Sequence, residues 1–129
     1  AAWHRVLALQ GKGRYHLTNE EYELAASFFR KSLVISSTTF DYYSCNHYLA
    51  KIHFKTKQLD SSLVYANAAL NFATQGGNIS NVINSNTLLA EIYEQTDSIR
   101  ALKYYKQALI LKDSLNFISH NFVLQPNPR

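Results

Sequence analysis

Apolar residues recur along this chain at spacings of three and four, and short polar segments interrupt them. Leu88 and Ile92, followed after a break by Leu102, Tyr105 and Leu109, illustrate the spacing. It is the spacing that places apolar side chains on one face of an α-helix. No stretch keeps the strict alternation of apolar and polar residues that a half-buried β-strand requires. The pattern therefore predicts an all-α fold.

Clusters of Ser, Thr, Asn, Asp and Gly mark where one helix ends and the next begins. Their side-chain oxygens can accept hydrogen bonds from the free amides of a first helical turn. Reading between these clusters predicts helices over residues 2–17, 20–36, 40–57, 60–75, 79–95 and 98–116. Short connections make neighbouring helices antiparallel, so we expect three helix-turn-helix pairs.

The second helices of the three expected pairs carry one common pattern. A small residue is followed by a larger one after four positions and by another small one after three more. The matching segments are Ala25-x3-Phe29-x2-Ser32-Leu33, Ser62-x3-Ala66-x2-Ala69-Leu70 and Ala101-x3-Tyr105-x2-Ala108-Leu109. Small residues at such positions allow close packing of one helix on another, which predicts a stack of repeated units.

This pattern resembles the tetratricopeptide repeat, most closely in the third unit, where Leu89-Ala90-x2-Tyr93 precedes Ala101. The resemblance implies a right-handed superhelix of three antiparallel pairs. We expect units at about 1–37, 38–76 and 77–117, making a domain over residues 1–117, and a tail over 118–129 that acts as a cap or a linker.

The chain also departs from the family pattern. Lys12 stands where a leucine is usual, and His16 and His53 replace a tyrosine. The units are 37 and 39 residues long, measured from Ser32 to Ala69 and from Ala69 to Ala108, against a usual period of about 34. Such lengthened units resemble those of bacterial regulatory proteins, in which the repeats often precede a membrane span and a histidine kinase or DNA-binding domain.

Composition narrows the class of protein further. The 129 residues include 13 Lys and Arg against 9 Asp and Glu, a net charge of +4 that is spread along the chain. A nucleic-acid footprint should cluster on one face, so we expect no nucleic-acid binding, and no apolar run is long enough to span a membrane.

Methionine is absent and the chain begins Ala1-Ala2-Trp3, which indicates a piece of a longer protein. One cysteine is compatible with the cytoplasm or the periplasm, so the compartment stays unknown.

No residue set predicts a metal, a cofactor or catalysis. Cys45 and His47 lie about 200° apart on one helix and cannot share a zinc ion. Cys45 also lacks an activating histidine one turn away, which favours a small core residue. Gly11-Lys12-Gly13 lacks the strand and the Gly-Lys-Ser/Thr ending of a phosphate loop. We therefore expect no enzyme and no bound cofactor.

The resemblance implies a groove that binds a protein or a peptide and is lined by the first helix of each pair. Its positions are Gln10, Arg14 and Leu17 in the first unit, Ser44, His47, Lys51, Phe54 and Lys55 in the second, and Asn84, Thr87, Glu91 and Glu94 in the third. Solvated surface is the alternative for these polar residues. Two other functions stay open: a sensor of a signalling peptide, and a scaffold that self-associates end to end through its uncapped repeats. Separately, exposed Tyr42 and Tyr104 are candidates for a self-association face in a homo-oligomer.

Overall fold

The structure is a computed structural model that describes the backbone of residues 2–123 and the side chains of residues 2–121. Over this range the chain forms six α-helices and no β-strand, which confirms the all-α prediction. The helices are α1 (Ala2–Thr18), α2 (Tyr22–Ile35), α3 (Thr39–Lys55), α4 (Leu59–Gly76), α5 (Ile79–Tyr93) and α6 (Ser98–Val123).

Two of the helix boundaries differ from the prediction because a residue adopts a left-handed backbone. Glu20 has φ of 60° and Lys57 has φ of 62°, so neither lies inside a helix as the sequence pattern suggested. After each of them the chain closes the preceding helix in the same way. The Glu21 amide donates to the His16 carbonyl at 2.9 Å, and the Gln58 amide to the His53 carbonyl at 2.8 Å. These are Schellman-type helix ends, built here without glycine.

The last helix is longer than predicted. We expected it to end near residue 116 and a tail to begin at residue 118, but α6 continues to Val123 without a break. No proline or glycine lies between Phe117 and Val123, so nothing in the sequence stops the helix there. The described part of the expected tail does not fold back as a cap, since Phe117 and Ile118 remain exposed. The rest of that tail, 124–129, lies outside the described residues.

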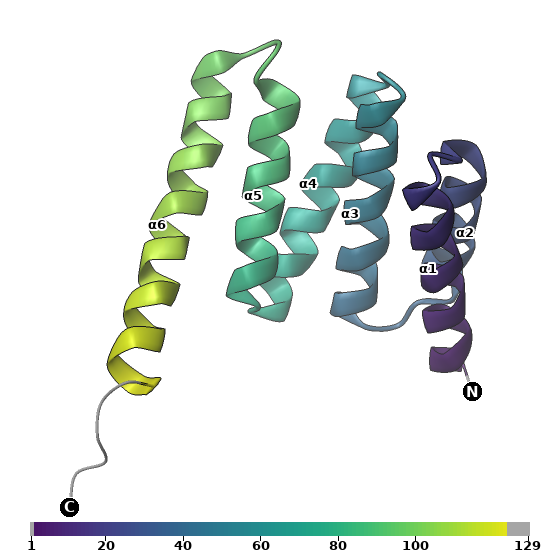
Figure 1. The fold of residues 1–129 in the computed structure, drawn as a ribbon, viewed down its shortest axis with the longest axis horizontal. Helices are drawn as coiled ribbons and strands as arrows, with labels where there is room; N and C mark the ends of the chain where they lie inside the picture. Colours follow the sequence, from purple (N-terminus) through teal and green to yellow (C-terminus); the bar gives the residue numbers. More distant parts are fainter. Residues whose placement is uncertain (1, 124–129) are drawn as a thin grey trace, which may run out of the picture.

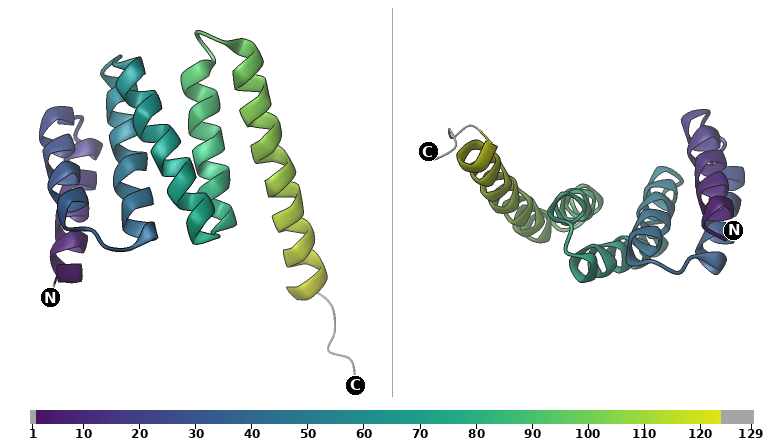
Figure 2. Two further views of the ribbon diagram at one scale, coloured as in Figure 1. Left: turned by 180° about the vertical axis from the view of Figure 1, so that it is seen from behind. Right: turned by 90° about the horizontal axis from the view of Figure 1, so that it is seen from below.

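Neighbouring helices run antiparallel and stand side by side in a row (Figure 1). Seen along the helix axes, the row bends into an arc (Figure 2, right). Among the described helices, α1 contacts α3 and α3 contacts α5, whereas α2, α4 and α6 make no contact with one another. The first helices of the three pairs therefore lie on the inner side of the arc, and the second helices on the outer side.

The shared pattern of the second helices forms the core on α2 and α4, whereas on α6 Ala101 and Ala108 are buried and Tyr105 is exposed. Ala25, Phe29 and Ser32 are fully buried on α2, and their counterparts on α4 are buried as well. Gly13 provides the space for Phe29, because a Cβ atom on Gly13 would lie only 2.7 Å from Cε2 of that ring. The expected packing of small residues against aromatic ones is therefore present between α1 and α2.

Aromatic pairs repeat from one helix pair to the next. His16 stacks on Phe28 at 5.4 Å between ring centroids, His53 stacks on Tyr65 at 5.2 Å, and Tyr93 stacks on Tyr104 at 5.8 Å, all within 7° of parallel. In each pair, one ring comes from the end of the first helix and the other from the second helix. The two histidines thus occupy the structural position of the tyrosine in the third pair.

Candidate functional site

A hollow of about 430 Å³ lies on the inner side of the arc and takes its walls from all three helix pairs. We call it the inner hollow. It is lined by Leu17, Thr18, Glu20, Tyr22, Lys51, Phe54, Lys55, Leu88 and Glu91. Five of the twelve groove positions expected from the sequence meet here: Leu17, Lys51, Phe54, Lys55 and Glu91.

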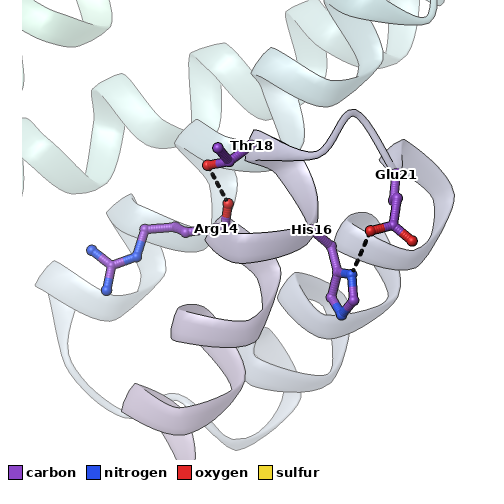
Figure 3. A network of polar contacts seen from close by, with 4 residues as sticks. All are labelled: Arg14, His16, Thr18 and Glu21. Carbon is purple, nitrogen blue, oxygen red and sulfur yellow. Dashed lines mark hydrogen bonds and ion pairs between the residues drawn. The ribbon is translucent and has the colours of Figure 1, made fainter.

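Helix ends position the first wall of the inner hollow. The last turn of α1 carries Leu17 and Thr18, and the hydroxyl of Thr18 donates to the Arg14 carbonyl at 3.0 Å, as Figure 3 shows. Thr18 is thereby held against its own helix. The left-handed Glu20 then reverses the chain, so that Tyr22, the first residue of α2, reaches the same wall. Nδ1 of His16 lies 3.1 Å from Oε1 of Glu21 across this reversal (Figure 3).

The inner hollow combines an apolar floor with charges of both signs. Leu88 is buried and Phe54 is half-buried, whereas Lys51, Lys55 and Glu91 are exposed. Among residues with described side chains, the ion pairs within 4.0 Å are His16–Glu21 and Arg100–Asp97, and neither involves the hollow's lysines or Glu91. The ammonium of Lys51 lies 5.9 Å from the Tyr48 ring centroid. These lysines and this glutamate are therefore available to a ligand.

Two of the expected groove residues are buried and hold helices together instead. Gln10 is 6% exposed and Ser44 is 8% exposed, and the Ser44 hydroxyl donates to Oε1 of Gln10 at 2.8 Å. Nε2 of Gln10 donates in turn to Oδ1 of Asp41 at 3.3 Å. The expectation that they line the groove is wrong, because α1 and α3 approach closely enough to cover both side chains. Their polar groups join α1 to α3.

His47 is half-buried among aromatic rings. It stacks on Tyr43 at 5.4 Å between centroids and meets the edge of the Tyr48 ring at 5.8 Å. Burial, together with the nearby charge of Lys51, lowers the pKa of His47 to about 4. Its Nδ1 is buried and has no hydrogen-bond partner among the described residues. His47 is thus neutral at pH 7 and contributes packing rather than charge.

The remaining expected positions lie outside the inner hollow. The Arg14 side chain is exposed and extends on the side of α1 away from His16 and Glu21 (Figure 3). Asn84 is exposed, and the Thr87 hydroxyl donates to the Ile83 carbonyl at 2.9 Å. Glu94 accepts a hydrogen bond from the Tyr105 hydroxyl at 3.4 Å. The structure therefore concentrates the site at one end of the inner surface.

The two tyrosines considered for self-association are partly covered. Tyr42 stacks on Phe72 at 5.0 Å, and its hydroxyl donates to the Ser36 carbonyl at 2.7 Å. Tyr104 stacks on Tyr93. Both rings stack within the fold and are half-buried, so a self-association face that includes them stays a prediction.

The residues that could bind a metal ion or act as a nucleophile do not cluster in the described part of the chain. Within the described range, no three His, Cys, Asp or Glu side chains come together in a way that could hold a metal ion. Cys45 is fully buried with Sγ 3.4 Å from Oγ of Ser32, and burial raises the pKa of its thiol. It occupies the core, as the sequence predicted. None of the described helices is both long and apolar enough to cross a membrane.

Sequence reasoning missed four residues of the inner hollow: Thr18, Glu20, Tyr22 and Leu88. The first three lie at the turn between α1 and α2, where helical periodicity no longer predicts which way a side chain points. Leu88 belongs to the core face of α5 and is 3% exposed. The polar turn Thr18-Asn19-Glu20 was the one available signal.

A larger hollow of about 530 Å³ opens elsewhere, between α2 and the end of α3, with Arg30 and Thr56 in its lining. Neither α1 nor α5 contributes to it. It therefore lies between two neighbouring pairs and does not form part of the inner surface. The inner hollow is the better candidate because it joins all three pairs.

This chain matches no family model, no curated protein and no solved structure.

Proposed function

We propose that this chain is a tetratricopeptide-like module that binds a peptide segment of a partner protein in its inner hollow. The observation that carries the proposal is the hollow's lining, which combines an apolar floor with unpaired Lys51 and Lys55 from α3 and unpaired Glu91 from α5. A right-handed superhelix of three pairs is the architecture that this proposal assumes. The resemblance alone supports a place within a bacterial regulatory protein.

Repeated local contacts support the tetratricopeptide-like class. The helix ends after His16 and His53 are closed by the same hydrogen bonds at an offset of 37 residues. The stacked ring pairs recur in all three units. The third helix end is closed over four residues rather than five, with the Asp97 amide donating to the Tyr93 carbonyl at 2.7 Å, and no left-handed residue occurs there. Such repetition is typical of a solenoid that offers an extended inner surface.

The lining favours a peptide of mixed character. An apolar side chain can bury against Phe54 and Leu88, and an acidic group can pair with Lys51 or Lys55. A basic group of the same peptide can face Glu91. Because the lysines lie on α3, between Glu20 at the α1–α2 turn and Glu91 on α5, they would hold an acidic residue of the bound segment over α3. We therefore expect an extended peptide that carries an apolar anchor beside an acidic residue.

The test is selection from a displayed random peptide library against the immobilised chain. Peptides enriched by the wild type should lose at least about tenfold in affinity for Lys51→Glu/Lys55→Glu, because two charge-assisted contacts become repulsive. The matched control is Arg5→Glu/Lys31→Glu, which makes the same charge change in a different hollow, between α1 and α2.

Urea denaturation of both double variants establishes that each is folded. The proposal predicts enriched peptides that contain an acidic residue and that bind the control variant like the wild type. It fails if no peptide is enriched, or if both double variants bind the enriched peptides equally well.

A further inference from the structure

Helix α6 presents an apolar surface on the side that faces away from α5. Five side chains there are between 55% and 82% exposed: Ile99, Leu102, Leu109, Ile110 and Phe117. They lie along one face at helical spacing, with Lys106 and Asp113 between them. We call these seven residues the α6 stripe. The opposite face carries Ala101 and Ala108 and packs on α5.

The leucines of α2 and α4 that correspond to Leu102 and Leu109 are covered, whereas Val34, the α2 counterpart of Ile110, is exposed. Leu63 and Leu70 of α4 occupy the positions of Leu102 and Leu109 of α6, and both pack in the cluster that contains Leu88 and Leu89 of α5. Leu33 of α2 packs in the same way in the cluster formed with α3. A helix with two apolar faces is normally buried on both. The α6 stripe therefore has the character of an interface.

The first helix of another copy is a poor occupant. If a second copy continued the stack end to end, its α1 would pack against α6 of the first copy. It would do so with the face that corresponds to the one α3 and α5 turn towards the preceding helix pair. Leu49 and Leu89, both fully buried, mark that face. Lys12 takes the equivalent position on α1 and is exposed, and it lines one surface hollow together with Arg5 and Lys31, so this end of the row carries positive charge. A charged terminal face is what limits stacking in repeat proteins.

The α6 stripe is instead complementary to itself when two copies run antiparallel. A twofold axis between Leu109 and Ile110 places Lys106 of one copy opposite Asp113 of the other, twice by symmetry. The same axis places Leu102 opposite Phe117. Each charge lies 3.5 residues from the axis, about 5 Å along the helix. We propose that two copies of this chain form a symmetric dimer through antiparallel pairing of their α6 stripes.

The size of the surface agrees with a specific but modest interface. Covering five largely exposed apolar side chains on each copy buries on the order of 1,000 Å² of accessible surface in total. This area is near the lower bound for a specific protein interface. Isologous contacts of this type are the commonest in homodimers. The inner hollow takes no residue from α6, so the dimer would leave both binding sites open. This inference stands independently of the proposed function.

Sedimentation velocity over about 1–500 μM chain provides the test, in a range suited to a modest interface. The wild type should shift from monomer to dimer with rising concentration. Leu109→Glu/Ile110→Glu should remain monomeric, because it places four carboxylates at the symmetry axis. The matched control is Val34→Glu/Val64→Glu, which changes residues 84% and 68% exposed on other helices. It should dimerise like the wild type.

A charge exchange tests the antiparallel register. Lys106→Asp and Asp113→Lys should each weaken the dimer about tenfold at low salt, because each creates two like-charged contacts. The double variant Lys106→Asp/Asp113→Lys should restore the wild-type dissociation constant. A wild type that stays monomeric throughout, a dimer that survives Leu109→Glu/Ile110→Glu, or a double variant no better than the single ones would overturn the proposal.

Discussion

The close approach of α1 to α2 can be tested with two glycines of the same helix. Gly13 faces Phe29, and a Cβ atom there would lie 2.7 Å and 2.8 Å from two carbons of the ring. The Phe29 ring is fully buried and stacks on Tyr48 at 4.8 Å, so it has no free direction in which to move. Gly11 lies two residues earlier in α1, and a Cβ atom there would meet nothing within 4 Å.

Substitution by alanine should therefore have opposite effects at the two sites. Gly11→Ala should raise the free energy of unfolding by about 0.5–1 kcal/mol, since alanine restricts the unfolded chain and favours the helix. Gly13→Ala gains the same preference but overpacks the core, which costs about 1–3 kcal/mol. Both variants gain the same helix preference of alanine, so this gain cancels when their stabilities are compared. Gly13→Ala should therefore be less stable than Gly11→Ala by about 1–3 kcal/mol.

Urea denaturation followed by far-UV circular dichroism measures this difference. The two variants share the substitution, the helix and the method, so errors of extrapolation largely cancel. If Gly13→Ala proves as stable as Gly11→Ala, then Phe29 does not lie against α1 as described, and the packing of the first helix pair is wrong.

Two further predictions concern buried side chains of α3. The Cys45 thiol, fully buried and with a raised pKa, should resist a thiol-specific reagent at pH 8 in native protein and react promptly in denaturant; rapid native labelling would refute its burial. His47 has a folded-state pKa of about 4, below its ordinary value of 6.5, so the unfolded chain binds its proton more readily. Stability should therefore fall as the pH drops from 6.5 towards 4. After allowance for the partly exposed ring, the wild type should lose about 2 kcal/mol more than His47→Gln between pH 7 and pH 4.5. Equal losses in urea titrations at the two pH values would contradict the lowered pKa.

The number of helices, and most of their extents, could be predicted because helix formation here depends on local patterns. The caps illustrate this: Thr38 and Asn78 each accept the amide of the residue three positions later at 3.1 Å, as their residue types suggest. The left-handed backbone of Glu20 and Lys57 could not be predicted. This conformation costs a non-glycine residue free energy, so such a residue adopts it only where the tertiary structure requires it.

The candidate site was predictable only in part. Lys51, Phe54 and Glu91 lie on helix faces whose direction follows from register, so their convergence could be expected from a stack of pairs. Gln10 and Ser44 share that register, yet the distance between α1 and α3 decides whether such side chains line a groove or bond to each other. That distance is set by packing across the whole stack and is not encoded in either helix alone.

The location of a bound peptide tests the central claim most directly. A photoreactive benzophenone residue can replace Glu91, which lines the inner hollow, or Val64, which is exposed on α4 outside it. After irradiation with a peptide from the library selection, mass spectrometry measures the cross-linked fraction. We predict efficient cross-linking from position 91 and none above background from position 64. Equal cross-linking from both positions, or cross-linking from position 64 alone, would contradict peptide binding in the inner hollow.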